Sequence, residues 1–431
     1  MRFSTLTTKK NIMETKINNN TTEIKKNEST GNPVEDKIEN FKNIIQDCNI
    51  SFLIGSGLSV PFMKTLGGIE KWLTGLEENK EISDELKQYI KASLYKSYFE
   101  VAMKGNVDIE SFDCDSDTVC STCSRPSELS ETYNTYKDFF KTINQILYER
   151  RSNTVNKQVN IFTTNIDVFC EKVIEDLGLH FNDGFNGIFR KQFQLSNFKK
   201  SFYQKSLHYD NIAEIPVFNL LKIHGSVTWK SRNGIIEFAG LDVLRDVISK
   251  IENIELLDIL GMDNKKWEDT KTDLTIEEII EEANKQTPIP STKDFIDVYE
   301  QLQVVNPTKD KFRDTTFNKT YYEMLRLYAN ELEKENSVLF VMGFSMADEH
   351  IRDITFRAIK SNPTLKVFIC SYTTEAKDII GNLSQDKIDL SNFHNVELLN
   401  PIEGFGLSKA NELLFIPLLE NIQLKKSNNR K

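Results

Sequence analysis

Short runs of β-branched and aromatic residues alternate with longer amphipathic stretches along most of this chain, and this alternation limits the possible folds more than any other feature. The runs are Ile50–Ile54, Val159–Thr163, Val217–Ile223, Val338–Met342 and Val367–Cys370, with Val396–Leu399 as a candidate sixth. Strands buried on both faces read as continuous apolar runs, and helices between them cover the sheet. The pattern predicts an α/β fold: a Rossmann-like parallel sheet with helices on both faces.

Two long stretches interrupt the alternation. Residues 66–150 and 240–335 are mostly helical by periodicity, as in residues 321–333, where Tyr322, Leu325 and Leu332 recur on one predicted face. We interpret both stretches as helical insertions that form a second layer within one large domain, residues 36–425.

The two ends of the chain are polar. Residues 1–35 are rich in Asn, Thr, Lys and Glu and offer little apolar surface, so they are expected to form a disordered tail. Residues 426–431 are expected to form a short polar tail.

Charge and hydropathy exclude several classes of protein. The net charge of −10 weighs against direct binding of nucleic acid, which needs a concentrated positive surface. No run approaches the roughly 18 apolar residues of a membrane helix. No apolar block follows Lys9 and Lys10, so a secretory signal is not expected, and the six cysteines are interpreted as reduced thiols. These features together predict a cytoplasmic protein.

The first motif of interest, Gly55-Ser56-Gly57-Leu58-Ser59, directly follows a predicted strand. Glycines at such a position let the backbone approach a phosphate closely. Glycine pairs at strand ends also form simple tight turns, and this motif lacks the third glycine and the downstream acid of the usual dinucleotide fingerprint. Both interpretations remain open for this segment alone.

Two further motifs also lie at strand ends. In Thr163-Thr164-Asn165-Ile166-Asp167, an amide and a carboxylate two residues apart can orient a sugar hydroxyl or a water, or can simply cap the following helix. In Ile223-His224-Gly225, a histidine at the ligand edge of a sheet can act as a general base, although most isolated histidines are structural.

The fourth motif joins a glycine turn to an acidic helix start. Gly343-Phe344-Ser345 follows the fourth strand, and Asp348-Glu349 is expected in the first turn of the next helix, where the helix dipole favours acids. Capping explains these acids, while the Gly343–Ser345 turn can contact a nucleotide.

Taken in order, these four motifs resemble the sirtuin family over roughly residues 45–400, outside the two insertions. The resemblance implies that NAD binds at the sheet edge. Gly55, Ser56, Gly57 and Ser59 would surround its pyrophosphate, and Asn165 with Asp167 would face the nicotinamide ribose. His224 would be the base. The remaining contacts would come from Thr164, beside Asn165, and from Gly343, Ser345 and Ser371 on the other loops.

The chain departs from the deacylases of that family. Residues 226–336 contain no cysteine, so the two Cys-x-x-Cys pairs that hold a structural zinc are missing. Cys114, Cys120 and Cys123 precede Asn165 and lack an obvious fourth ligand, so no metal is expected there. A deacylase arginine is also absent beyond Ser59. The chain more closely resembles the zinc-free, sirtuin-like branch of bacterial antiviral defence.

That resemblance implies an NAD hydrolase that releases nicotinamide and ADP-ribose as an NAD-depleting effector in antiphage defence. It also implies a homo-oligomer, with a hexameric DNA-translocating ATPase or another sensor as a possible partner. Two alternatives remain. The same NAD pocket can serve a protein deacylase or ADP-ribosyltransferase, or the chain can be a non-catalytic subunit that senses NAD or ADP-ribose.

Overall fold

The computed structural model describes most of the chain. It covers residues 45, 47–65, 68–113, 123–150, 155–262, 274–306, 319–373, 375–399 and 404–428. The predicted tail at residues 1–35 lies outside the described residues, and of the predicted polar end only residues 426–428 are described, as the last residues of a helix. Among the described helices, none is both long and apolar enough to cross a bilayer.

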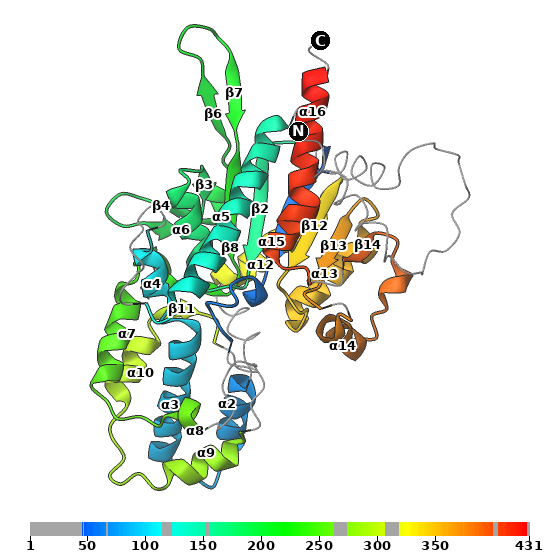
Figure 1. Cartoon of the computed structure of the whole chain (residues 1–431). Helices are drawn as coiled ribbons and strands as arrows, with labels where there is room; N and C mark the ends of the chain where they lie inside the picture. The colour runs from blue at the N-terminus through cyan, green and yellow to red at the C-terminus, as the bar shows by residue number, and fades with distance from the viewer. Residues whose placement is uncertain are drawn as a thin grey trace, which may run out of the picture.

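A seven-stranded parallel sheet forms the centre of the molecule (Figure 1). Its strands, in spatial order, are β14 (Val396–Leu399), β13 (Lys366–Cys370), β12 (Ser337–Met342), β1 (Asn49–Ile54), β2 (Gln158–Thr163), β8 (Val217–Lys222) and β3 (Phe181–Asn182). The six apolar runs form every strand of this sheet except β3. The predicted α/β class is therefore confirmed.

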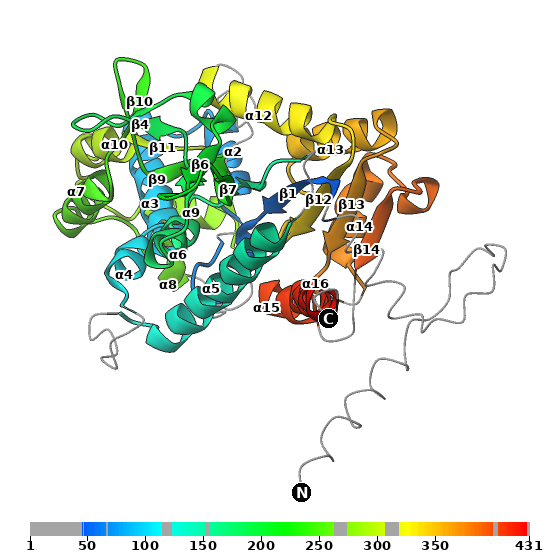
Figure 2. The same ribbon diagram turned by 90° about the horizontal axis from the view of Figure 1, so that it is seen from above.

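Helices cover both faces of the sheet, which lies between them when seen from above (Figure 2). One face carries α5 (Pro126–Glu149), α6 (Phe169–Asp176), α15 (Leu407–Ala410), the π-helix η4 (Asn411–Phe415) and α16 (Ile416–Asn428), and the other carries α12 (Lys319–Leu332), α13 (Glu349–Ser361) and α14 (Lys377–Gln385). Neighbouring strand residues point to opposite faces. Phe52 accordingly packs against Phe139 of α5 with ring centroids 5.1 Å apart, whereas Leu53 belongs to the core on the α12 side.

Helix α12 presents a different tyrosine to the core from the one that its sequence suggested. Tyr321 is buried, and Tyr322 is 49% exposed. The buried face repeats at Tyr321, Leu325, Tyr328 and Leu332, with the spacing of 4, 3 and 4 residues that one side of a helix requires. The expectation for Tyr322 was wrong because it gave the stripe a three-residue first step instead of a four-residue step.

The two inserted stretches build one helical module together. Its helices are α2 (Ile69–Glu78), α3 (Asp84–Ala102) and α4 (Asn106–Ser111) from the first stretch, and α7 (Asp242–Glu252), α8 (Ile259–Met262), α9 (Ile276–Ala283) and α10 (Lys293–Tyr299) from the second. Tyr95 of α3 stacks on Tyr299 of α10 with centroids 4.4 Å apart. The last helix of each stretch, α5 or α12, packs on the sheet and not in this module, because the chain continues from it into the next strand of the sheet.

A smaller antiparallel sheet lies beside β8. It contains β11 (Leu302–Val304), β9 (Gly225–Arg232), β10 (Ile235–Phe238), β5 (Gln192–Phe193) and β4 (Phe185–Asn186). A separate hairpin of β6 (Phe202–Lys205) and β7 (Ile212–Ile215) projects from the body (Figure 1). The described elements are completed by the 3₁₀ helices η1 (Ser56–Leu58), η2 (Leu195–Lys199) and η3 (Leu390–Asn392).

Candidate functional site

The carboxyl ends of β12, β1, β2 and β8 form one continuous edge. Ile54 pairs with both Met342 and Thr163, and Thr163 pairs with Lys222, so these four residues form one row across the sheet. Ligands of open parallel sheets bind in the crevice outside such an edge. Asn165 and His224 each follow this row by two residues, in the loops after the neighbouring strands β2 and β8.

The glycine motif packs against the loop that follows β12. The Gly57 N–H donates to the Gly343 carbonyl at 2.9 Å. A Cβ on Gly55 would lie 2.5 Å from the Gly343 oxygen, and one on Gly57 would lie 2.9 Å from it. Gly343 itself has a φ of +61°. Glycine is therefore required here so that two backbones can touch, while Ser56 and Gly57 remain exposed at the edge.

The side chains of Ser59, Asn165, Asp167 and Tyr136 meet in what we call the buried cluster. Ser59 Oγ donates to Asp167 Oδ2 at 2.7 Å, and Asn165 Nδ2 donates to Ser59 Oγ at 3.0 Å. The Tyr136 hydroxyl lies 3.1 Å from the same Ser59 oxygen. All four residues are buried. The Ser59 hydroxyl is thus occupied within the protein, which leaves the backbone of its loop to face a ligand.

Asn165 keeps one polar atom without a partner. The residue is 7% exposed, and its side-chain oxygen Oδ1 makes no hydrogen bond to any residue that the structure describes. A buried amide oxygen without a donor is uncommon, and in native proteins it calls for a specific explanation. A ligand hydroxyl or a water at the sheet edge would supply the missing donor.

The capping interpretation fits Asp167 but not Asn165. Asp167 Oδ1 accepts the Phe169 N–H at 3.2 Å at the start of α6. Asn165 instead directs its amide at Ser59, and its own N–H donates to Thr163 Oγ1 at 2.9 Å. The two side chains therefore have separate roles, with Asp167 bridging the helix start and the buried cluster.

Tyr136 is a member of this cluster that sequence reasoning missed. It comes from α5, where it reads as one more aromatic residue of a buried helix face. Burial raises the pKa of Tyr136 well above its ordinary value, and the negative charge of Asp167 raises it further. The phenol therefore stays protonated at neutral pH and can serve as a donor.

His224 and Asp348 form a second group, here called the His–Asp pair. His224 Nε2 lies 3.2 Å from Asp348 Oδ2, and their side chains are 19% and 16% exposed. The two residues follow β8 and β12, which have β1 and β2 between them, roughly 14 Å of sheet at the usual strand spacing. The loop after β12 therefore reaches across the ends of both central strands.

Asp348 is held in place by the helix that it caps. Its Oδ1 accepts the N–H groups of His350 and Ile351, each at 3.1 Å, which leaves Oδ2 for His224. Burial acts to raise the pKa of Asp348, but the hydrogen bond and charge of His224 and the α13 amide of Ile351 outweigh it and hold the pKa well below its usual range. A neutral His224 that donates from Nε2 carries its basic lone pair on Nδ1.

Gly225 lets the chain turn sharply directly after His224. It has a φ of +78°, and a Cβ there would lie 2.0 Å from the Gln303 carbonyl oxygen. The His224 carbonyl accepts the Val305 N–H at 2.8 Å. Strand β11 of the second insertion therefore fixes the backbone of the predicted base.

A buried ion pair supports the edge from beneath. Lys222, the last residue of β8, donates to Glu171 Oε1 of α6 at 2.8 Å and also to the Asp167 carbonyl oxygen. The Lys222 side chain is 3% exposed. Burial raises the pKa of Glu171, and the positive charge of Lys222 counteracts this. The pair ties α6 to the strand end and fixes the backbone at Asp167.

The remaining predicted contact residues form their hydrogen bonds outside these two groups. Ser345 is exposed, and its carbonyl accepts from Asn382 Nδ2 at 2.8 Å. Ser371 is buried, and its hydroxyl donates to the Thr373 carbonyl at 2.8 Å, which closes a local turn. Thr164 is half-buried, and its N–H donates to the Ile54 carbonyl at 3.1 Å. In the described part of the chain, no hydrogen bond of these residues reaches Asn165 or His224.

Among the described residues, no group of three or more His, Cys, Asp or Glu side chains is arranged to hold a metal ion. Cys114 and Cys120 lie outside the described residues, and Cys123 is buried. No protein-family model and no curated protein matches this chain. The sheet edge, where an amide acceptor and a carboxylate-bound imidazole follow neighbouring strands, is therefore the candidate functional site.

Proposed function

We propose that this chain is an NAD glycohydrolase that cleaves the bond between nicotinamide and ribose. The observation that carries the proposal is the buried Asn165 amide, whose oxygen lacks a donor and which follows β2 at the level where His224 follows β8. A ribose hydroxyl or a water bound there would satisfy the amide and lie at the edge that the imidazole also occupies. The order of the four motifs, which resembles the sirtuin family, supports NAD as the substrate.

Cleavage of this bond requires little from the protein beyond positioning of the substrate and transfer of a proton. The C1′–N bond breaks with its electron pair passing to the nicotinamide ring, which loses its positive charge and leaves as a neutral base. The ribose passes through an oxocarbenium-like state that nearby negative charge stabilises. Water forms the new C1′–O bond and gives up a proton, so the products are ADP-ribose, nicotinamide and one proton.

Each group in the site has a role in this scheme. Asn165 orients the ribose or the attacking water through its free oxygen, and Asp167 supplies compensating negative charge from behind Ser59. His224 accepts the proton on Nδ1, while Asp348 stabilises the imidazolium that forms. The exposed backbone at Ser56 and Gly57 is available for the pyrophosphate. Ser345 and Ser371, on loops further along the edge, would lie near the rest of the dinucleotide.

The resemblance to the sirtuin-like proteins of antiviral defence also supports a biological role. Unrestrained hydrolysis of NAD would harm the cell, so we propose that activity is held off until assembly or a partner releases it. The expected setting is antiphage defence, with self-association and a DNA-translocating ATPase or another sensor as the candidate trigger.

The deciding experiment is chromatography of NAD products formed by the purified chain, alone and with the candidate partner. We expect nicotinamide and ADP-ribose from the wild-type chain and neither from His224→Ala. His208→Ala is the matched control because His208 is exposed at the end of the projecting hairpin. Formation of O-acyl-ADP-ribose with an acylated peptide would favour a deacylase instead. Tight NAD binding without nicotinamide release, even with the partner, would favour a sensor.

A further inference from the structure

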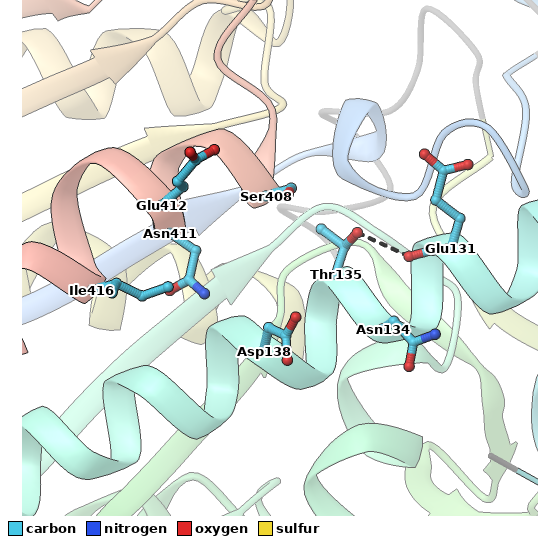
Figure 3. A pocket seen from close by; sticks show the side chains of 8 residues that line it. All are labelled: Glu131, Asn134, Thr135, Asp138, Ser408, Asn411, Glu412 and Ile416. Atoms are coloured by element: carbon cyan, nitrogen blue, oxygen red, sulfur yellow. Dashed lines mark hydrogen bonds between the residues drawn. The ribbon is translucent and has the colours of Figure 1, made fainter. Parts of the chain in front are cut away.

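A hollow of about 380 Å³ lies on the α5 face of the molecule, between α5 and the helices near the C-terminus (Figure 3). Its lining residues come from one face of α5 and from α15, η4 and α16: Glu131, Asn134, Thr135, Asp138, Ser408, Asn411, Glu412 and Ile416. None of them belongs to the buried cluster or to the His–Asp pair. The volume lies within the usual range of small-molecule sites.

The charge of this hollow is entirely negative. Glu131 and Asp138 contribute carboxylates from α5, and Glu412 contributes a third from the opposite wall. The lining residues include no Lys or Arg, and Glu412 pairs with Lys409, whose Nζ lies 3.3 Å from Glu412 Oε2. A positively charged ligand is the natural complement.

Two neutral polar groups of the hollow use a donor within α5. The Thr135 hydroxyl donates to the Glu131 carbonyl at 2.8 Å within α5, as Figure 3 shows. Asn134 Nδ2 donates to Ser130 Oγ at 3.3 Å, and the amide oxygen of Asn134 can act as an acceptor. A ligand here would therefore have to bring N–H donors of its own.

Asn411 is a second, independent observation that points to a ligand site. It is 3% exposed, and its Oδ1 has no hydrogen-bond partner among the described residues. In Figure 3 its side chain extends from η4 toward α5, with the amide nitrogen on the side of Asp138 and the unpaired oxygen on the side of Ile416, which also lines the hollow. Asn411 also begins the π-helical turn Asn411–Phe415, a local widening that is frequent at functional sites.

These observations together specify the chemistry of the occupant. In the described part of the chain the hollow lacks the three converging ligands that a metal ion needs, and its volume exceeds that of a single ion. An organic cation with several N–H groups matches the carboxylates and the orphan amide at once. We propose that this hollow is a binding site for a linear di- or polyamine, independent of the NAD proposal.

Calorimetric titration of the full-length chain with spermidine at low salt tests this directly. We expect saturable binding with one site per chain. The double variant Glu131→Gln/Asp138→Asn should weaken it at least tenfold, and Asn411→Leu should weaken it as well. Glu277→Gln is the matched control, because it removes an exposed carboxylate on α9, away from the hollow. The surface variants keep the test valid if the buried Asn411 substitution impairs folding.

Two results would overturn the proposal. One is binding that does not saturate, or that falls equally in Glu277→Gln and in the double variant, since this is general attraction to an acidic protein. The other is full displacement of spermidine by an equal concentration of Mg²⁺, which would indicate a simple cation site. Unchanged spermidine affinity in chains whose NAD turnover has been abolished by His224→Ala would support the site as a separate feature.

Discussion

The buried cluster and the His–Asp pair lie at the same edge of the sheet but are built in opposite ways. The cluster is closed: Ser59, Asn165, Asp167 and Tyr136 are buried and bind one another. The pair is partly open to solvent and depends on a single contact between two loops. A closed hydrogen-bond network fixes the positions of its side chains, whereas a solvent-accessible imidazole can exchange protons with water.

The two groups also depend on different parts of the chain. The cluster is supported on the α5 face, through Tyr136 of α5 and the Lys222–Glu171 ion pair of β8 and α6. The pair is supported from α13, whose first amides bind Asp348. Substitutions can therefore damage one group while leaving the other intact, and this separates positioning from proton transfer.

The largest expected effect comes from removing one functional side chain from each group. Asn165→Ala and His224→Ala should each lower NAD turnover by about 10²–10⁴-fold, the range of a positioned acid–base group. Circular dichroism and the urea midpoint should stay close to those of the wild type. Rates come from product chromatography at saturating NAD, and unaltered turnover in the purified double variant would remove the proposed mechanism.

Lys222→Met should cost the most stability and should act on the cluster alone. It leaves the partly buried Glu171 without its cation, so the pKa of Glu171 rises further and the free energy of unfolding falls by up to about 3–5 kcal/mol. Lys172→Met is the control, because Lys172 pairs with Asp176 along the surface of α6 and its loss should cost about 0.5 kcal/mol or less. Urea unfolding measures both, and similar losses would contradict the buried role of Lys222.

Asp348→Asn should act on the pair alone. Asparagine keeps the helix cap but not the charge, so turnover should fall about 10–100-fold, and the acidic limb of the pH–rate profile, where the rate rises as the base loses its proton, should move to lower pH. Asp389→Asn, at the exposed start of η3, is the control and should leave turnover unchanged. A profile that does not move would show that Asp348 only caps α13.

Asp348→Asn should also change how the stability of the fold depends on acid pH. The pKa of Asp348 is lower in the folded chain than the unfolded value of about 3.9, so its ionisation stabilises the fold. This contribution is fully present above about pH 5 and is lost as the pH falls toward the folded pKa. The difference in unfolding free energy between wild type and Asp348→Asn should therefore shrink below pH 4, and a constant difference would contradict the assignment.

The main sheet was predictable because its strands are buried on both faces and read as continuous apolar runs. The antiparallel sheet was not, since β9 and β11 pair Ser226 with Gln303 and nothing local marks that partner. The packing of the two insertions against each other could not be predicted for the same reason. Contacts such as Tyr95 on Tyr299 join segments about 200 residues apart, and periodicity only shows that each has an apolar side.

The site was partly predictable through the residues that follow each strand. Glycines, an amide and a histidine after strand ends are visible in the sequence, and the register places the last residues of those strands in one row. What each atom does was not visible. Ser59 uses its hydroxyl inside the cluster, and Asp348 divides its two oxygens between a helix and an imidazole. Tyr136 gave no signal, because a tyrosine on a buried helix face is ordinarily core.

Tyr136→Phe is the smallest and sharpest test of whether the buried cluster acts as a unit. The variant removes one hydroxyl and leaves the ring stacked on Phe169, so the unfolding free energy should fall by only about 1 kcal/mol. Tyr133→Phe on the same helix removes the hydroxyl that binds Asp176 and should cost a similar amount. If the cluster positions Asn165, only Tyr136→Phe should also raise the KM for NAD, with no change in the pH profile that His224 sets. Equal KM values in the two variants would mean that Tyr136 only fills space beneath the edge.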